Sequence, residues 1–221
     1  FDPQHFHNFG HLMRFWILLA ALQGCWVRSV KNFRRYHLPW QSESKQDVTL
    51  VENLFRNREM GFFVELGAAD GKYLSNTYAL EHGMNWTGIL IEPLTEEVEK
   101  CPAHRPSSTC VQACVSQTPG VQDFFEDTRE RVQSGLVRLN MDSVQQKSSI
   151  LAMRQVHCQT LPKILKQHAA PQVIDWLSLD VERAELEVLE TLFEDGYFHF
   201  DVISMEAQTP EESLDRYGFM R

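Results

Sequence analysis

The sequence predicts a Rossmann-like α/β fold, in which a doubly wound, mostly parallel sheet carries helices on both faces. Short apolar runs recur along the chain and alternate with segments of helical periodicity. This alternation implies β-α-β units with right-handed crossovers. The length of 221 residues suits one such domain. We expect the strands at residues 62–66, 87–91, 109–115, 173–181 and 200–205.

The segments between these strands predict the helices of each unit. In residues 184–194, the side chains of Leu186, Leu189, Leu192 and Phe193 recur at helical spacing and are expected to face the sheet. We expect the other helices at residues 47–57, from a Ser75–Asn76 cap to about His82, after Pro93, at 161–168 and at 211–217.

Residues 117–155 are more polar than their surroundings and interrupt the alternation of strands and helices. Strand-like pieces lie at 121–125 and 135–139. We interpret this segment as an excursion over the top of the sheet rather than as a separate domain. Loops above the strand ends commonly govern substrate choice in such folds, so we expect the excursion to influence the choice of substrate.

The composition narrows the function classes. The formal net charge of −9 disfavours non-specific binding of nucleic acid, which requires a basic face, so no nucleic-acid partner is expected. Five cysteines without metal-ligand spacing are interpreted as small buried hydrophobic residues rather than as a disulfide framework, and no metal site is predicted. A single pairing, such as Cys101 with Cys110, stays open.

Residues 1–45 differ from residues 46–221, which carry the regular pattern, and form a separate N-terminal segment. The apolar run 15–27 has basic flanks, but its thirteen residues fall short of the ~18–20 that a spanning helix needs. It is interpreted either as a short helix packed on the domain or as a helix that contacts a membrane surface. The localisation stays open between the cytoplasm and an endomembrane. Because the chain starts at Phe1 and stops in what looks like a new element, we expect a fragment truncated at its carboxyl end.

The loop after the first predicted strand combines glycines with acids. Gly67 and Gly71 permit a tight turn and a close backbone approach, while Glu65 and Asp70 add negative charge. A dinucleotide site presents N–H groups to a pyrophosphate, which acids would oppose. Carboxylates favour instead the ammonium and sulfonium of S-adenosylmethionine. For this loop taken alone, a purely structural turn is the alternative.

Two further strands end in acids. Glu92 can accept hydrogen bonds from both ribose hydroxyls of a nucleoside, or it can act as a helix-start acid. Asp180 sits where an otherwise apolar strand emerges, and Glu182 and Glu185 follow it closely. Such neighbouring acids can separate one another's pKa values and supply a general base, while helix N-terminal charge pairing is the alternative for one of them.

Three segments together resemble a known family. The sequences GFFVELGAADGKYLSNTYALE, WTGILIEP and IDWLSLDVERAELEVLE look like the FkbM-type methyltransferase domain, and most like its animal Star-like branch. The resemblance extends from about Gln46 to Glu206. It implies a class I methyltransferase fold with S-adenosyl-L-methionine as cofactor. The implied reaction is the methylation of a hydroxyl oxygen, often on a sugar or a small molecule.

The resemblance also implies roles for individual residues. The methionine part of the cofactor would be lined by Glu65, Gly67, Asp70 and Gly71, and the SNT motif of Ser75, Asn76 and Thr77 would support that loop, with Asn76 counted among the cofactor-binding residues. Glu92 would hold the ribose. The methyl donor and acceptor would be faced by Asp180, Glu182, Glu185 and Glu206.

The chain departs from the family pattern at two places. Arg183 stands where the family usually has glycine, and the carboxyl-terminal antiparallel strand pair of the family is missing. A long cation beside Asp180 would put turnover in doubt. The alternative function is therefore a non-catalytic, Star-like binding or trafficking module that keeps the fold. Star-like members are membrane-anchored by a short N-terminal segment, which favours membrane contact for residues 15–27. A nicotinamide-dependent oxidoreductase is a third hypothesis, disfavoured because the first loop lacks G-x-G-x-x-G.

Overall fold

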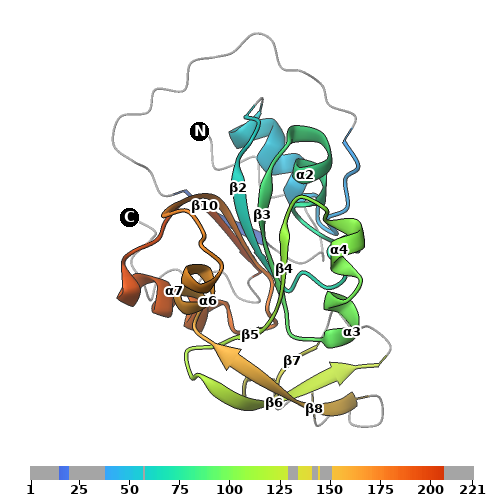
Figure 1. Cartoon of the computed structure of the whole chain (residues 1–221), viewed down its shortest axis with the longest axis vertical. Helices are drawn as coiled ribbons and strands as arrows, with labels where there is room; N and C mark the ends of the chain where they lie inside the picture. Colours follow the sequence, from blue (N-terminus) through green and yellow to red (C-terminus); the bar gives the residue numbers. More distant parts are fainter. Residues whose placement is uncertain are drawn as a thin grey trace.

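A computed structural model of the chain describes residues 15–19, 38–56, 58–128, 134–140, 144 and 151–206. Its main sheet has six strands in the order β1-β10-β9-β2-β3-β4, and the five strands from β10 to β4 are parallel (Figure 1). This arrangement confirms the Rossmann-like fold. The strands are β1 (Phe15–Leu19), β2 (Phe62–Leu66), β3 (Thr87–Glu92), β4 (Thr109–Gln112), β9 (Val173–Leu179) and β10 (His199–Glu206).

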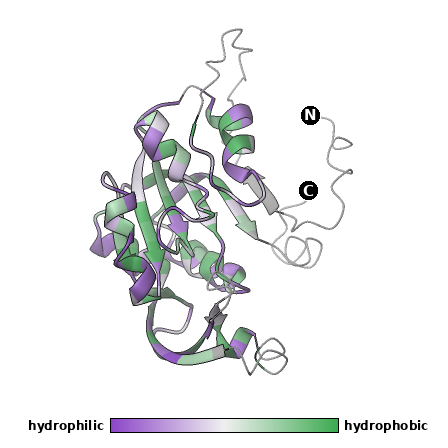
Figure 2. Cartoon of the chain, turned by 90° about the vertical axis from the view of Figure 1, so that its right-hand side faces the viewer, coloured by the Kyte–Doolittle hydropathy of each residue, from purple (hydrophilic) through white to green (hydrophobic). Residues whose placement is uncertain are grey.

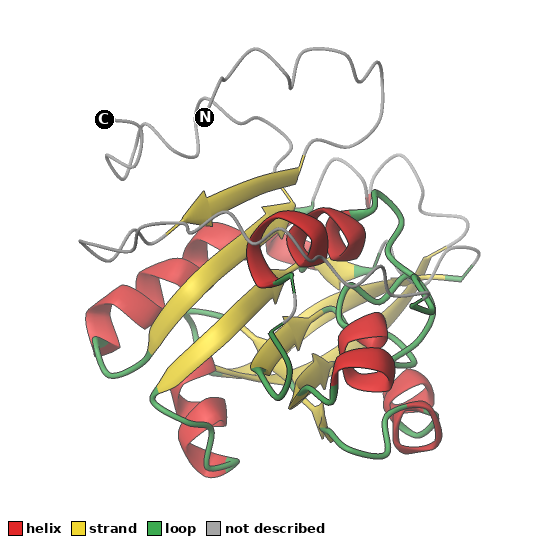
Figure 3. Cartoon of the chain, turned by 90° about the horizontal axis from the view of Figure 1, so that it is seen from above, coloured by secondary structure: helices red, strands yellow, loops and turns green. Residues whose placement is uncertain are grey.

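Helices cover both faces of this sheet, as the view from above shows (Figure 3). One face packs on α6 (Leu161–Gln167) and α7 (Glu185–Asp195). The other face packs on α1 (Gln46–Leu50), the π-helical turn η2 (Val51–Phe55), α2 (Tyr78–Met84) and α4 (Cys101–His104). The short helix α3 (Thr95–Val98) follows β3. Because the central strands are buried on both sides, they read as continuous apolar runs, and their ribbons are mostly hydrophobic in Figure 2.

The predicted helices agree with these elements, with three differences in detail. The helix expected at 47–57 begins at Gln46 and continues from Leu50 as the π-helical turn η2. Thr77, not Ser75 or Asn76, is the N-cap of α2, although the Ser75 hydroxyl accepts a hydrogen bond from the N–H of Tyr78 at 3.1 Å. The prediction for Phe193 is wrong, because its side chain is 50% exposed. The helix predicted at 211–217 lies outside the described residues.

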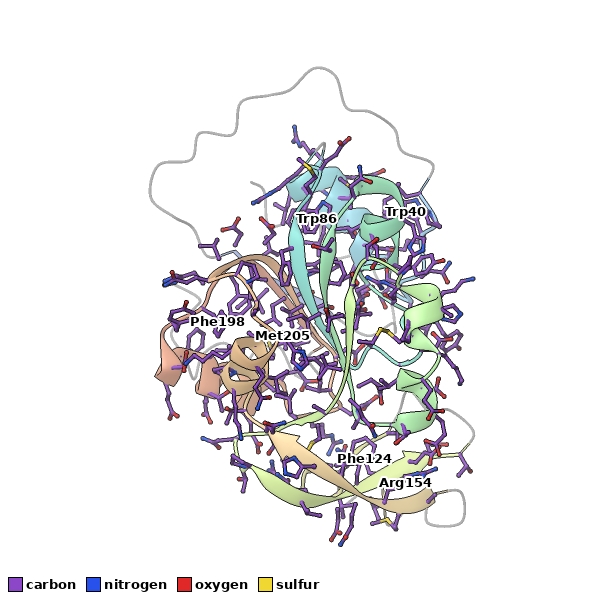
Figure 4. The ribbon with its side chains drawn as sticks, in the orientation of Figure 1. Trp40, Trp86, Phe124, Arg154, Phe198 and Met205 are labelled. Carbon is purple, nitrogen blue, oxygen red and sulfur yellow. A yellow bond between two sulfur atoms is a disulfide. The ribbon has the colours of Figure 1, made fainter. Side chains whose placement is uncertain are left out.

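The polar segment after β4 builds a second sheet in the order β5-β8-β6-β7, at the bottom of Figure 1. Its strands are β5 (Cys114–Val115), β6 (Gly120–Asp127), β7 (Gly135–Leu136) and β8 (Leu151–Gln159), and the 3₁₀ turn η4 (Val137–Leu139) follows β7. Its buried side chains, which include Phe124, Leu136 and Val156, form a separate apolar cluster with Leu94, which follows β3. Figure 4 labels Phe124 and Arg154 in this lower sheet.

The single strand predicted at 109–115 is divided between the two sheets. Residues Thr109–Gln112 pair with β3, whereas Cys114 and Val115 pair with β8. Val111 in the first half and Cys114 and Val115 in the second are buried, so apolar residues continue across the break and the sequence could not show where the chain leaves the first sheet.

The N-terminal apolar run corrects a second prediction. Phe15–Leu19 forms the strand β1, antiparallel to β10, and not the beginning of a helix. Pairing there satisfies the N–H and C=O groups that β10 would otherwise present at the sheet edge. The remainder of the run, residues 20–27, lies outside the described part of the chain. Within the described residues, no helix is long and apolar enough to cross a membrane.

The cysteines correct a third prediction. Cys101 pairs with Cys110, the pairing left open by the sequence, and Cys114 pairs with Cys158, which the sequence did not suggest. The first disulfide ties α4 to β4, and the second ties β5 to β8. The sequence patterns suggest burial but not partners, and Cys114 and Cys158 are 44 residues apart.

Candidate cofactor and acceptor site

A cavity of about 590 Å³ opens at the carboxyl ends of the parallel strands. It lies where the strand order reverses, between β2 and β9, which is the place where open α/β sheets bind their ligands. Leu66 is in register with both Ile91 and Leu179, so the loops that follow the three strands start at the same level. The predicted site residues that line this cavity are Glu65, Gly67, Asp70, Asn76, Glu92, Asp180 and Glu182.

Gly67 starts the first of these loops and allows two strand ends to approach each other. Its backbone N–H donates to the carbonyl of Ile91 at 3.0 Å, and its φ of +72° belongs to the left-handed region that favours glycine. A Cβ atom there would overlap the backbone carbonyl oxygen of Asp180. Glycine is therefore required by both conformation and space.

Glu65 is 3% exposed and holds the far end of the same loop. Its carboxylate accepts hydrogen bonds from the Ser75 hydroxyl at 2.9 Å, the Asn76 backbone N–H at 2.7 Å and the Thr77 hydroxyl at 2.5 Å. These bonds explain why a carboxylate is tolerated in a buried strand. They also give the SNT motif a common anchor, which agrees with the expectation that these residues support the loop.

Asn76 carries an atom without a partner. Its Nδ2 donates to the Ser178 hydroxyl at 2.9 Å, but its Oδ1 is the one buried side-chain polar atom, among the residues that the structure describes, that lacks a hydrogen bond. Since Asn76 lines the cavity and is 5% exposed, a donor from a bound molecule would satisfy this oxygen.

Asp70 and Gly71 occupy the middle of the loop. The Asp70 carboxylate accepts the backbone N–H groups of Lys72 at 2.9 Å and Tyr73 at 2.7 Å, which folds the chain into a compact turn. The Asp70 carbonyl also accepts a hydrogen bond from His104 Nδ1 at 2.9 Å. Asp70 lines the cavity, whereas the Gly71 carbonyl points toward Arg105 and accepts a hydrogen bond from it at 3.0 Å.

Glu92 ends β3 and faces the Gly67 loop. Its Oε2 accepts the N–H of Ala69 at 3.0 Å and its Oε1 accepts the N–H of Leu94 at 2.9 Å. Burial raises the pKa of Glu92 to about 7 and the neighbouring Glu97 adds to the rise, although both N–H groups oppose it. Each carboxylate oxygen keeps a further lone pair for a ligand.

The acids after β9 have different surroundings. Asp180 and Glu182 are half-buried and line the cavity, and the backbone carbonyl of Glu182 accepts a hydrogen bond from Asn140 Nδ2 at 3.0 Å. Glu185 is buried, and its carboxylate accepts the Val181 N–H at 3.0 Å, a contact that holds the turn. Glu206 ends β10, but the structure does not describe its side chain, so its place in the acceptor pocket stays a prediction.

Arg183 is exposed, and its guanidinium donates to the Leu139 carbonyl at 3.5 Å. The residues that line the cavity include Asp180, Val181, Glu182 and Ala184 but not Arg183. Both Glu182, with a φ of +51°, and Arg183, with a φ of +79°, have left-handed backbone conformations. Such conformations are strained for residues other than glycine and often occur at functional sites. The usual glycine of the family would relieve the strain at position 183.

We expect the free energy of unfolding of Arg183→Gly to be about 1 kcal/mol higher than that of Arg183→Ala, because glycine adopts the left-handed conformation without strain and alanine does not. Alanine provides the matched control, since both substitutions remove the guanidinium. Urea denaturation would measure the difference. An alanine variant as stable as the glycine variant would contradict the assignment of strain to this residue.

Some site residues were not predicted from the sequence. Phe124 and Leu136, from the second sheet, form an apolar part of the cavity wall, and Arg105 lies beneath the loop after β2. An isolated arginine or phenylalanine carries no motif, and only its position in the fold assigns it to the site. Among the described residues, no group of three or more His, Cys, Asp or Glu side chains is placed to hold a metal ion.

The Rossmann-like sheet with an acid-lined cavity at its strand ends is consistent with a class I methyltransferase fold. The chain belongs to the FkbM methyltransferase domain family, whose pattern matches residues 65–221. The match covers all seven cavity-lining residues that the sequence predicted. A comparison with curated proteins gave no match.

Proposed function

We propose that the chain is an S-adenosyl-L-methionine-dependent methyltransferase that acts on a hydroxyl oxygen of a small molecule or a sugar. The observation that carries the proposal is the unpartnered Oδ1 of Asn76 at the cavity wall. An ammonium group is a suitable donor for this oxygen, and the cofactor has one at its methionine end. The cofactor supplies an activated methyl group when bound.

The other cavity residues fit the same cofactor. The acidic residues Glu65, Asp70, Asp180 and Glu182 are among those that line the cavity, and their negative charge favours a ligand with positive charges. Glu92 can accept hydrogen bonds from two ribose hydroxyls through its remaining lone pairs. These two assignments would place the methionine end near Asn76 and the nucleoside near Glu92.

The acceptor is proposed to lie between the acids after β9 and the second sheet. Asp180 and Glu182 would orient its hydroxyl group, and one of their carboxylates would take the proton as the oxygen forms its new bond. Phe124 and Leu136 add an apolar part to the cavity wall, which would exclude water. Glu185 is a weaker choice for the base, since its carboxylate is buried in the turn.

The non-catalytic alternative rested on the possible membrane anchor and on Arg183, which could fill the acceptor site. Its exposed side chain and its hydrogen bond to the Leu139 carbonyl weigh against that role.

The two disulfides favour an endomembrane location over the cytoplasm, because disulfides persist in oxidising compartments and are rare in the cytosol. We therefore favour an endomembrane compartment.

Calorimetric titration with S-adenosylhomocysteine tests the cofactor. We expect binding with a micromolar dissociation constant, about −8 kcal/mol, and no heat from NAD as the control ligand. A folded protein that binds no S-adenosylhomocysteine would refute the proposal. A protein that binds it but transfers no labelled methyl group to a panel of sugars and hydroxylated small molecules would support the binding module instead.

A further inference from the structure

Arg105, directly after α4, is a buried cation to which the proposed chemistry gives no direct part. Its side chain is 0% exposed. Burying a guanidinium is costly unless its N–H groups are paired. Here Nε donates to Glu81 Oε2 at 2.7 Å, Nη1 donates to the Gly71 carbonyl at 3.0 Å and the Ser75 hydroxyl at 3.1 Å, and Nη2 donates to the Thr77 hydroxyl at 2.8 Å.

Three of these four partners belong to the loop between β2 and α2. Glu65 holds the same loop from the other side, and its Oε2 lies 3.7 Å from Arg105 Nη1. The Ser75 and Thr77 hydroxyls are each bonded to both Arg105 and Glu65. Asn76 lies between Ser75 and Thr77 in the chain. Because each of these neighbours is held by hydrogen bonds to both Arg105 and Glu65, they fix the direction of the Asn76 side chain.

The guanidinium also stacks against aromatic rings. Its carbon lies 5.0 Å from the ring centre of Phe63 and 5.9 Å from that of Tyr78. Gly71 approaches it so closely that an added Cβ would lie 2.9 Å from Arg105 Cγ and 3.0 Å from Cys101 Sγ. A planar fork with several donors suits this space, whereas the single ammonium of lysine would leave acceptors without partners.

We propose that Arg105 is a positioning residue for the methionine end of the cofactor. It fixes the Gly71–Thr77 loop, so that Asn76, whose Oδ1 lacks a partner, is held at the cavity wall before the ligand arrives. A pre-positioned acceptor avoids the cost of ordering the loop on binding. This inference rests on the proposed function. The Arg105 network reaches residues 71–77, whereas Glu92 bonds to Ala69 at the start of the loop. Its loss should therefore affect the methionine end and spare the nucleoside.

Two ligands separate positioning from general stability. S-adenosylhomocysteine has the amino-acid end, and 5′-methylthioadenosine lacks it. We expect Arg105→Met to weaken the first at least tenfold and to change the second less than twofold, with Arg105→Lys in between. Calorimetry on the full chain measures both. Arg58→Met is the control, because Arg58 also pairs with two carboxylates, Asp175 and Asp201, but near the amino ends of β9 and β10, away from the cavity.

Removing Arg105 leaves Glu81 buried without its cation, and the variant could fail to fold. Thr77→Val then carries the test, since it keeps the ion pair between Arg105 and Glu81 and removes the hydroxyl through which both Arg105 and Glu65 hold the loop. We expect it to weaken S-adenosylhomocysteine by about two- to tenfold and to spare 5′-methylthioadenosine. Equal weakening of both ligands, or of neither, would overturn the positioning role. A wild-type protein that binds neither ligand would instead overturn the proposed function.

Discussion

Replacement of Gly67 by alanine is expected to abolish binding of S-adenosylhomocysteine and to lower the free energy of unfolding by about 2–5 kcal/mol. Two costs add up in this estimate, a left-handed conformation for a residue with a side chain and an overpacked contact. The contact is with the backbone carbonyl oxygen of Asp180, which cannot rotate away as a side chain would. The strand ends of β2 and β9 would have to separate, and both of them line the cavity.

Gly196→Ala is the control for this prediction. Gly196 has a φ of +61°, close to the +72° of Gly67, but its nearest atom to an added Cβ is the Phe193 carbonyl oxygen at 3.9 Å. It should therefore lose only about 1 kcal/mol, from the conformation alone, and keep its ligand affinity. Urea denaturation and calorimetry on both variants measure the two effects. If Gly67→Ala behaved like Gly196→Ala, the close approach of the two strand ends would not matter for the site.

Glu92→Ala is expected to weaken S-adenosylhomocysteine at least tenfold, which corresponds to about 1.4 kcal/mol. The variant removes the acceptor for the ribose hydroxyls, and it also frees the N–H groups of Ala69 and Leu94 that shape the adjoining turns. Glu92→Gln separates these effects, because it keeps the size and one acceptor oxygen. A Glu92→Ala variant with wild-type affinity would show that the nucleoside lies elsewhere.

The same carboxyl group predicts a pH dependence of binding. Burial raises the pKa of Glu92 to about 7, so that in the free protein the group is largely protonated at pH 6 and largely ionised at pH 8. The ionised form accepts hydrogen bonds from hydroxyl groups at both oxygens, and affinity should therefore rise by roughly tenfold from pH 6 to pH 8. Glu92→Gln should flatten the profile. A wild-type affinity that falls or stays constant over this interval would contradict the role.

The sequence predicted the central strands well, because burial on both faces leaves a continuous apolar run with clear ends. β2 has the expected bounds of 62–66, and β9 begins at the expected Val173 but ends at Leu179, two residues before the expected end at 181. The acids at the strand ends could be predicted for the same reason. A carboxylate at the end of a buried strand stands out in the chain, and parallel strands bring such ends to one edge. Glu92 and Asp180 were found in this way and line one cavity.

The tertiary structure decided which groups pair across long separations. Local periodicity reports whether a residue is buried, but it does not report its hydrogen-bond partner. Hence the structure alone divided 109–115 between two sheets, placed Phe15–Leu19 on the edge of β10 and joined Cys114 to Cys158. It also brought Arg105 beneath the loop after β2 and turned Arg183 toward Leu139. These contacts depend on where the chain returns in space, which no pattern of neighbouring residues encodes.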